Sequence, residues 1–273
     1  MFHVVIVLYN KYLSSIDTIY SSFKNDITNM VYIDNSIDNL IVNDNKRYAQ
    51  CNKMNYFEMY GNKGLSKAYN FAIKNITFSK NDYVVILDDD TEIPNDFFYK
   101  MQLNINSNPY VKIFVPLILD NIGIMSPSKK TILGYKHSKI LNFNKYIKKY
   151  SFINSGMCIS VDIFTRIQYD ENLFLDYIDF DFINTIRKTY KTNVIHIIDT
   201  IKLKQDFSGA QKNTFEQDFK RYSIFVKDSL VYHKKWYDHL LSLNLIRRTI
   251  KLTFQHKSIV FFKLLFHKLR ESK

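Results

Sequence analysis

Short apolar runs, separated by intervals long enough for a helix, constrain the fold of this chain more than any other feature. The runs are His3–Leu8, Val31–Ile33, Tyr56–Met59, Tyr83–Leu87 and Ile113–Val115. β-Branched and aromatic residues are typical of such buried strands, and polar or turn-forming residues follow each run. In the interval Leu65–Ile76, apolar residues recur at helical spacing behind the turn Gly61–Gly64. We therefore predict an α/β fold with a mostly parallel central sheet, whose ligand crevice lies beyond the carboxyl ends of the strands.

Composition narrows the class of protein. Of the 273 residues, 46% are apolar and 23% are charged, which is typical of a folded globular chain. The apolar runs are far shorter than the roughly 20 residues of a membrane-spanning helix. The segment Met1–Val5 enters an apolar run without a basic leader, and we therefore expect a cytoplasmic protein. The two cysteines, Cys51 and Cys158, form no CxxC pair, which disfavours both a disulfide framework and a cysteine zinc site.

The pattern changes twice towards the C-terminus. Asn, Ser, Lys and Gly with scattered aromatic residues predict a long loop or an irregular subdomain over Asp120–Tyr150. From Thr214 to about Arg270 the sequence is helical, with a break predicted near Ser242–Asn244. We divide the chain into a domain of residues 1–240, with halves 1–118 and 119–240, and a basic amphipathic helix at 241–273.

The run Val84–Leu87 ends abruptly in three carboxylates, Asp88, Asp89 and Asp90. Adjacent carboxylates raise one another's proton affinity unless a cation neutralises them, and Mg²⁺ or Mn²⁺ suits such hard oxygen ligands. A divalent ion here would bridge to a diphosphate. One alternative is a solvated acidic turn that caps a helix at Asn95 or Asp96. Another is a phosphohydrolase with Asp88 as nucleophile and Asp90 as acid/base, although that fold normally carries the motif on its first strand.

Further motifs accompany the acidic run. They are Val4–Asn10, Val31–Ser36, Gly61–Asn70, Asn154–Ser160 and Asp170–Asp181. Together with Asp88–Asp90 they resemble the inverting family 2 glycosyltransferases, particularly the rhamnosyltransferase-like branch of bacterial surface polysaccharide synthesis. The resemblance covers roughly residues 3–230. It implies a Rossmann-like nucleotide-binding GT-A fold with a mostly parallel central sheet and a C-terminal helical extension.

The resemblance implies a donor site and a metal site. The residues that would hold a nucleotide-diphosphate-sugar are Tyr9, Asn10, Asp34, Asn62, Gly64, Lys67, Asn70, Asp88 and Asp89. Asp88 and Asp90 would bind Mn²⁺ or Mg²⁺. Taken alone, Gly61 and Gly64 are more typical of a tight turn without a ligand. Relatives commonly carry a metal-binding His where this chain has Gln205, so that Gln205, Asp206 or water would complete the metal site.

The resemblance also implies an acceptor side, with Asp179 as the general base. Its other residues are Asn154, Ser155, Gly156 and Asp181. The residues themselves narrow the choice of base in part, because Asp176, Asp179 and Asp181 cannot all be buried and ionised without partners. On a helix, Asp181 points about 200° away from Asp179, so that one faces the cleft and the other holds structure. The alternative is a solvated helix start whose carboxylates favour the helix dipole.

Two other positions carry no firm assignment. Arg187 matches an Arg of the family, although a structural ion pair explains it equally well. The pair Lys227-Asp228 stands near the place where relatives have Arg-Asn. We assign this pair no role.

The C-terminus is strongly basic. The formal charge is +12, and the last 30 residues hold eight Lys or Arg and one Glu, a net +7. Basic residues alternate there with aromatic and aliphatic ones, as in an amphipathic helix resting on an anionic bilayer, where each basic residue contributes about 1 kcal/mol. The alternative is a helix packed on the enzyme with a solvated basic face. No nucleic-acid motif accompanies the tail, and we therefore expect no nucleic-acid partner.

These features together predict an enzyme that transfers a sugar, with inversion and with a divalent cation, from a nucleotide-diphosphate-sugar to a hydroxyl of a glycan acceptor. We expect a lipid-linked acceptor in bacterial surface polysaccharide synthesis, and an enzyme held peripherally on the inner face of the cytoplasmic membrane. The alternative outside enzymes is an inactive module of the same fold that binds a membrane or another polyanion.

Overall fold

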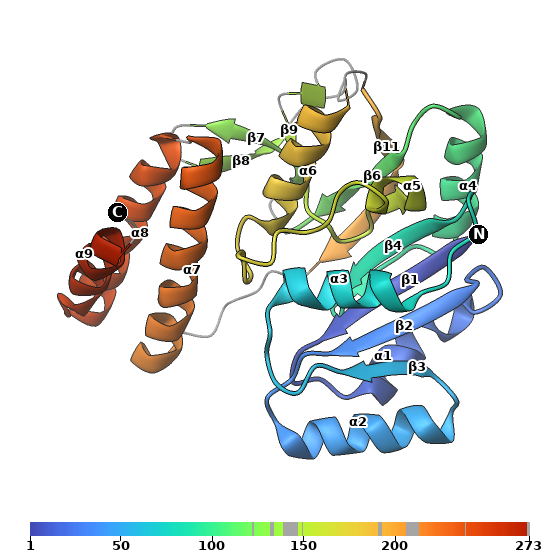
Figure 1. Ribbon diagram of the computed structural model, residues 1–273, viewed down its shortest axis with the longest axis horizontal. Helices are drawn as coiled ribbons and strands as arrows, with labels where there is room; N and C mark the ends of the chain where they lie inside the picture. Colours follow the sequence, from blue (N-terminus) through green and yellow to red (C-terminus); the bar gives the residue numbers. More distant parts are fainter. Residues whose placement is uncertain are drawn as a thin grey trace.

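The computed structural model describes residues 1–121, 123–131, 134–138, 147–148, 150–190, 193–205, 213–237 and 239–271 (Figure 1). One sheet runs through the described part of the chain. Its strands, in spatial order, are β3 (Asn55–Glu58), β2 (Asn29–Asp34), β1 (Phe2–Leu8), β4 (Tyr83–Asp88), β10 (Cys158–Ser160), β6 (Ile113–Leu119), β11 (Ile195–Gln205) and β5 (Thr91–Glu92). All five strands predicted from the apolar runs are confirmed, within one to four residues at their ends.

The strands of the N-terminal half are parallel, as the alternation of strands and helices predicts. β3, β2, β1 and β4 pair in parallel, and β10 then pairs antiparallel with both β4 and β6. In the register of the sheet, Leu8 lies opposite Asp34 and Val7 lies opposite Asp88. The carboxyl ends of β1, β2 and β4 therefore meet at one edge, where polar residues follow each strand.

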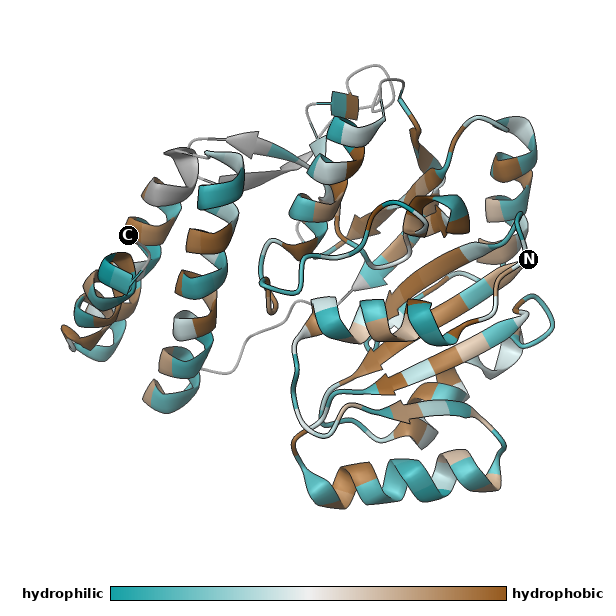
Figure 2. Ribbon diagram, viewed as in Figure 1, coloured by the Kyte–Doolittle hydropathy of each residue, from teal (hydrophilic) through white to brown (hydrophobic). Residues whose placement is uncertain are grey.

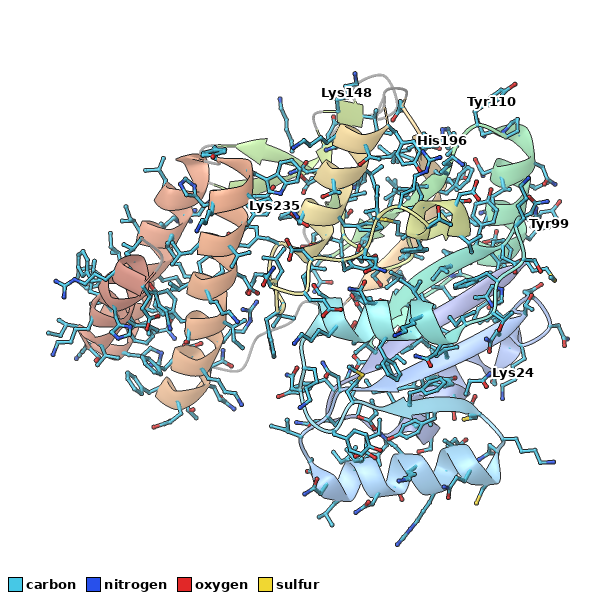
Figure 3. All side chains as sticks on the ribbon, in the orientation of Figure 1. Lys24, Tyr99, Tyr110, Lys148, His196 and Lys235 are labelled. Atoms are coloured by element: carbon cyan, nitrogen blue, oxygen red, sulfur yellow. The ribbon has the colours of Figure 1, made fainter. Side chains whose placement is uncertain are left out.

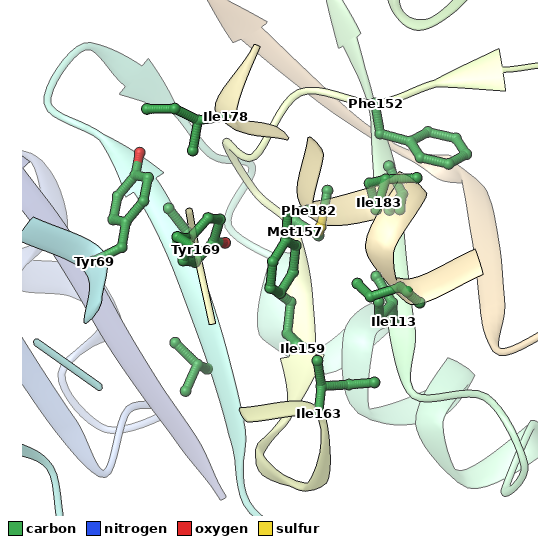
Figure 4. Close-up of a cluster of buried hydrophobic side chains, with 14 of the residues drawn as sticks. Tyr69, Ile113, Phe152, Met157, Ile159, Ile163, Tyr169, Ile178, Phe182 and Ile183 are labelled. Carbon is green, nitrogen blue, oxygen red and sulfur yellow. The ribbon is translucent and has the colours of Figure 1, made fainter. Parts of the chain in front are cut away.

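Side chains of β1 alternate between the two faces of the sheet. Val5 and Val7 pack on one face with α3 (Leu65–Asn75), α5 (Val161–Phe164) and α6 (Ile178–Thr189). Figure 4 shows part of this core, in which Tyr169 and Phe182 stack with ring centroids 4.2 Å apart. Val4, Ile6 and Leu8 pack on the other face. The helices there are α1 (Leu13–Tyr20), α2 (Asn39–Cys51) and α4 (Phe97–Ser107). The strands are correspondingly hydrophobic in Figure 2, whereas α2 is mostly hydrophilic.

Strands occupy part of the region predicted to be a long loop or an irregular subdomain. They are β7 (Ile124–Thr131), β8 (Gly134–Ser138) and β9 (Tyr150–Ser151). β7 extends the sheet from β6 and pairs antiparallel with β8 and β9. The sequence concealed this extension because backbone pairing, rather than a run of apolar side chains, forms it.

Three helices follow the sheet and pack on one another. They are α7 (Phe215–Trp236), α8 (His239–His256) and α9 (Val260–Glu271), which stand beside the sheet in Figure 1. Their shared core contains Tyr222, Phe225, Leu252 and Phe261. None of the helices within the described ranges is long and apolar enough to cross a membrane.

The predicted break near Ser242–Asn244 is wrong, because these residues lie inside α8. The chain turns instead after α7 at Tyr237 and after α8 at Lys257, both of which have positive φ. The segment 241–273, predicted as one helix, therefore contains most of α8 and all of α9. Burial of Leu245 against α7 outweighs the weak helix propensity of the neighbouring Ser and Asn.

Candidate active site

A cavity of about 600 Å³ opens between the carboxyl edge of the sheet and α7. The wall formed by the sheet and its loops carries Val7, Tyr9, Asn35, Asn62, Gly64, Leu65, Asp88, Asp89 and Asp90. The opposite wall on α7 carries Gln217, Lys220, Arg221 and Ile224. Phe174 and Leu175 complete the lining. Three carboxylates therefore face a wall with two cationic side chains across a space large enough for a small-molecule ligand.

The acidic turn after β4 rests on buried hydroxyl groups. The backbone N–H of Asp88 donates to Ser155 Oγ at 3.2 Å, and Ser155 Oγ lies 2.6 Å from Thr91 Oγ1. On the other side, Tyr20 donates its hydroxyl to the carbonyl of Thr91 at 2.6 Å. Ser155 and Thr91 are both buried. These contacts set the position of the three carboxylates at the edge of the sheet.

The segment Asn154–Gly156 therefore supports the acidic turn and does not line this cavity, and its place on the acceptor side stays a prediction. Asn154 and Ser155 are buried. Gly156 donates its N–H to the carbonyl of Ile86 at 2.7 Å, and it has a φ of +74°. A Cβ at this position would collide with the side chain of Leu203, which explains the glycine.

The three carboxylates of the turn differ in their surroundings. Asp89 accepts a hydrogen bond from Lys11 Nζ at 2.7 Å and another from the backbone N–H of Tyr9 at 3.2 Å. These contacts tie Asp89 to the loop after β1. Asp88 and Asp90 line the cavity on either side of it. The carboxylate of Asp89 is thus engaged by a lysine.

The donor set at the cavity suits a divalent cation that is shared with a substrate. Within the described residues, no group of three or more His, Cys, Asp or Glu is arranged to hold a metal. Mg²⁺, however, is usually held by one or two carboxylates together with substrate phosphates, and Asp88 with Asp90 match that pattern. The backbone of Gln205 pairs with Thr91, next to the turn. Asp206 lies outside the described residues.

Asp34 and Asn10, predicted to meet a nucleotide, hold the loops at the edge of the sheet. The buried carboxylate of Asp34 accepts hydrogen bonds from Ser36 N, Asn45 Nδ2 and Tyr56 Oη at 2.8–3.0 Å. Asn10 Oδ1 accepts from the backbone N–H groups of residues 37 and 38. Neither residue lines the cavity, whereas Tyr9 does.

The glycine turn before α3 reaches the cavity. Asn62 Oδ1 accepts from the N–H of Gly64 and from Asn35 Nδ2, both at 3.0 Å. Gly64 has a φ of +91°, and a Cβ there would lie 2.8 Å from the carbonyl oxygen of Phe174. Only glycine fits this approach. Asn35, which the sequence reading missed although it follows Asp34 in the same motif, joins Asn62 in the lining.

Lys67 and Asn70, predicted to lie beside a diphosphate, belong to a different cavity, along α3. The amide of Asn70 donates to the carbonyl of Tyr169 at 2.9 Å and accepts from the N–H of Tyr169 at 3.0 Å. A further hydrogen bond joins Asn70 Nδ2 to Glu171 at 3.1 Å. Asn70 therefore connects α3 to the segment before α6.

Helix α7 holds the segment that leads into α6. The buried carboxylate of Asp228 accepts hydrogen bonds from three consecutive backbone N–H groups, those of Phe174, Leu175 and Asp176, at 2.8–3.0 Å. Arg221 forms a two-point ion pair with Asp176. Because Phe174 and Leu175 line the cavity, Asp228 has a role that the sequence did not reveal.

Asp179 and Asp181 have different environments on the first turn of α6. Asp181 is buried and bonds to Lys235 Nζ at 2.9 Å and to Trp236 Nε1 at 2.7 Å, and Figure 3 shows Lys235 between α7 and α6. Asp179 is half-buried. Burial, with smaller effects of the charges of Asp88 and Asp176, raises the pKa of Asp179 to about 7, although backbone N–H groups oppose this rise. Asp179 is not among the residues that line the 600 Å³ cavity.

Arg187 lies away from the cavity and braces the strand extension. Its Nη2 donates to the carbonyl oxygens of Ile147 and Tyr150, at 2.9 and 2.6 Å. Its guanidinium also lies over the ring of Phe152, 5.5 Å from the centroid. These contacts are structural.

Solved structures of similar fold define the class of this protein. The crystal structure of GalNAc-T7 with UDP, GalNAc and Mn²⁺ has a TM-score of 0.60 and 15% identity, covering 99% of this chain but 57% of that chain. The structure of S. aureus TarS residues 1–349 in complex with UDP-GlcNAc has a TM-score of 0.56 and 14% identity, covering 99% of this chain and 80% of that one. The protein thus has the GT-A glycosyltransferase fold, and the predicted fold class is confirmed.

Sequence comparison assigns the family. Residues 3–174 match Glycosyl transferase family 2, and the chain belongs to this family. It is 26% identical over 207 residues to the dTDP-rhamnosyl transferase RfbF of Shigella flexneri, covering 74% of this chain and 67% of that protein. The predicted resemblance is therefore confirmed, and the chain is a glycosyltransferase.

Proposed function

We propose that this glycosyltransferase moves a sugar, with inversion, from a nucleotide-diphosphate-sugar to a hydroxyl of a glycan acceptor. The observation that carries the proposal is the 600 Å³ cavity, in which Asp88 and Asp90 face Lys220 and Arg221. A diphosphate suits the space between these walls, because its negative charge attracts the cationic side chains and its oxygen atoms can bind a metal ion together with the two carboxylates. Tyr9, Asn35 and Asn62, at the edge of the same cavity, would contact the nucleoside.

Asp88 and Asp90 are the proposed ligands of a divalent cation, Mn²⁺ or Mg²⁺. When bound, the cation would offset the negative charge of the diphosphate. Lys220 supplies further positive charge from the α7 wall. Asp89, bound to Lys11, would hold the loop after β1 in place around the nucleotide.

Asp179 is the proposed general base. Its carboxylate would accept the proton of the acceptor hydroxyl while that oxygen forms a bond to the anomeric carbon. The bond from the anomeric carbon to the diphosphate oxygen breaks in the same step, and its electron pair leaves with the diphosphate. A single displacement from the opposite face inverts the configuration. A pKa near 7 makes Asp179 a stronger base than an ordinary Asp while leaving it substantially ionised at neutral pH.

A panel of nucleotide-sugars tests this function. Each donor is added with Mn²⁺ to the full chain, the midpoint of thermal unfolding is measured, and release of nucleoside diphosphate is followed without acceptor. A true donor raises the midpoint because it binds the folded state, and it is hydrolysed slowly. Binding without any release or transfer, with every donor and acceptor tried, would favour the alternative of an inactive binding module.

The class of acceptor and the cellular location of the enzyme are also proposals. Similarity to a rhamnosyl transferase supports a role in bacterial surface polysaccharide synthesis on a lipid-linked acceptor. On α8, the exposed apolar residues Leu243, Ile246, Ile250 and Phe254 recur every three or four positions. Exposed Arg247 and Lys251 lie beside them. Such a face suits a peripheral position on an anionic membrane, which in this reading is the inner face of the cytoplasmic membrane.

A further inference from the structure

A second cavity, of about 940 Å³, runs along α3. It shares no lining residue with the 600 Å³ cavity proposed to bind the nucleotide-sugar, called the donor cavity below. Its lining comes from α3, from the loop between α3 and β4, and from the segment that includes α5. Lys67, Asn70, Phe71 and Lys74 lie on α3, whereas Phe78 and Lys80 follow it. Phe164 and Glu171 lie on the facing segment.

The charges around this cavity are unbalanced in favour of cations. Lys67, Lys74 and Lys80 are exposed, and none of them forms an ion pair with another described residue. The two carboxylates of the lining are already engaged. Asp162 pairs with Lys112 at 2.8 Å, and Glu171 accepts a hydrogen bond from Asn70 at 3.1 Å. An anionic ligand would therefore meet three lysines without displacing an existing partner.

Three aromatic rings, each packed against another ring, belong to the lining of this cavity. Phe71, Phe78 and Phe164 are half-buried. Each ring is held by another, since Phe71 contacts Phe57, Phe78 contacts His3, and Phe164 stacks on Phe182, with centroids 5.1–6.0 Å apart. Rigid aromatic rings offer flat apolar faces, which complement the C–H faces of sugar rings. Lysines beside aromatic rings thus suit a ligand that carries both sugar rings and negative charge.

The two cavities lie close together along the helix. Gly64 and Leu65 line the donor cavity, and Lys67 is the first residue of α3 in the second one. From Lys67 to Lys74 the helix rises about 10 Å, at 1.5 Å per residue. A ligand chain that follows α3 would therefore begin near the donor cavity and extend away from it.

We propose that the cavity along α3 binds an anionic segment of the glycan acceptor, bearing carboxylate or phosphate groups. Because it concerns the acceptor, this inference rests on the proposed transfer to a glycan. Lysines suit the task because an ammonium group attracts anions as a point charge and does not demand one planar geometry. The lysines would retain the polymer while its terminal sugar enters the active site.

Direct binding tests the proposal without donor or transfer. Three oligosaccharides of equal length are titrated calorimetrically into the full chain: an oligogalacturonate, a phosphorylated malto-oligosaccharide and a neutral malto-oligosaccharide. The variant Lys67→Gln/Lys74→Gln/Lys80→Gln is compared with a control, Lys46→Gln/Lys53→Gln/Lys227→Gln, which removes equal charge at exposed positions elsewhere. We expect an anionic probe to bind the wild type at least tenfold more tightly than the neutral one. The first variant should lose about tenfold in affinity, and the control less than twofold.

The result identifies the source of the negative charge as well. Preference for the carboxylated or the phosphorylated probe names the anionic group of the acceptor, and equal binding of both shows that charge alone is recognised. Equal affinity for neutral and anionic probes, no binding of any probe, or an equal loss in the control variant would overturn the proposal. Donor hydrolysis, measured on the same samples, reports the proposed transferase function independently, so that either idea can fail alone.

Discussion

The carboxylate of Asp228 accepts a hydrogen bond from the backbone N–H of Asp176 at 2.8 Å, and this contact joins α7 to the segment that leads into the proposed base. The same carboxylate accepts from the two preceding N–H groups. Burial raises the pKa of Asp228, and the three N–H groups partly oppose this rise by stabilising the carboxylate. This buried carboxylate, together with the ion pair of Arg221 with Asp176, thus couples α7 to the segment before Asp179.

Asp228→Ala should lower the free energy of unfolding by about 3 kcal/mol, because three part-buried N–H groups lose their acceptor. Transfer by the folded fraction should fall as well, since the segment before Asp179 is no longer held. Denaturant unfolding and initial rates at saturating donor measure the two effects. Lys227→Ala, at the exposed neighbouring position, should stay within about 0.5 kcal/mol of the wild type. If Asp228→Ala is as stable as the wild type, the three hydrogen bonds to Asp228 contribute nothing to the free energy of unfolding.

Asp179→Asn should lose transfer by at least about 10²-fold while it still folds and binds the nucleotide-sugar. The change keeps the size of the side chain and removes its ability to accept a proton. Asp181→Asn is the contrasting variant, since it weakens the contacts to Lys235 and Trp236 and should mainly reduce stability. Transfer rates and donor titrations are compared for both. The base moves to Asp181 if Asp181→Asn abolishes transfer with donor binding intact while Asp179→Asn stays active.

The pH dependence of stability should also change in Asp179→Asn. The raised pKa means that the folded state holds this proton up to about pH 7, whereas an unfolded Asp loses it near about 3.9. The folded state binds more protons between these values, so that this stabilising contribution is complete below about pH 3.9 and is lost as the pH rises through about 7. Asp179→Asn should therefore exceed the wild type in stability at pH 8, with a smaller difference at pH 5.

Thermal unfolding of both proteins is measured in buffers that contain a chelator, at about pH 5, 6, 7 and 8, which cover the window in which their difference in stability should change. Glu92→Gln, at an exposed position of β5, serves as the control for the loss of one carboxylate. A difference for Asp179→Asn that does not change with pH contradicts the raised pKa.

Removal of divalent cations should abolish transfer, and Mn²⁺ or Mg²⁺ should restore it, because Asp88 and Asp90 place negative charge beside the proposed diphosphate site. Asp90→Ala should be the most damaging change in the acidic turn and should weaken donor binding as well as turnover. Donor affinity is measured with and without Mn²⁺ in Asp90→Ala and in the nearby control Glu92→Ala. Full activity in excess chelator would rule out the metal.

The exposed face of α8 should determine membrane binding. Ile250→Asp/Phe254→Asp should reduce sedimentation with anionic vesicles, because it removes apolar area and adds negative charge to a basic surface. Wild-type binding should weaken as salt is raised, since electrostatic attraction is screened. Tyr99→Asp/Tyr110→Asp adds the same charge at exposed positions on and after α4 and should leave binding unchanged. Equal loss in both variants would assign the effect to net charge rather than to α8.

The local pattern of apolar and polar residues was sufficient to predict the sheet and the acidic turn at its edge. The β-branched runs of β1, β2 and β4 are buried on both faces and therefore carry a continuous apolar signal. Their connections are long enough to hold a helix, so that the strands run parallel, which brings the ends at Leu8, Asp34 and Asp88 together. The acidic turn and Gly64 were also found from the sequence. Each has a structural explanation when taken alone, but they occur together with the other motifs of the family.

The partners of individual polar side chains were decided only by the tertiary structure. Asp34 and Asp181 are buried and bonded to other residues, whereas burial raises the pKa of Asp179. Ser155 supports a turn 67 residues away in the chain, and Asp228 holds a segment 52 to 54 residues away. A motif specifies which groups are available, but the free energy of burying a carboxylate depends on donors supplied by distant parts of the chain. The sequence alone thus determined the family, the sheet and the acidic edge, and folding determined which carboxylates support the structure and which face the cavity.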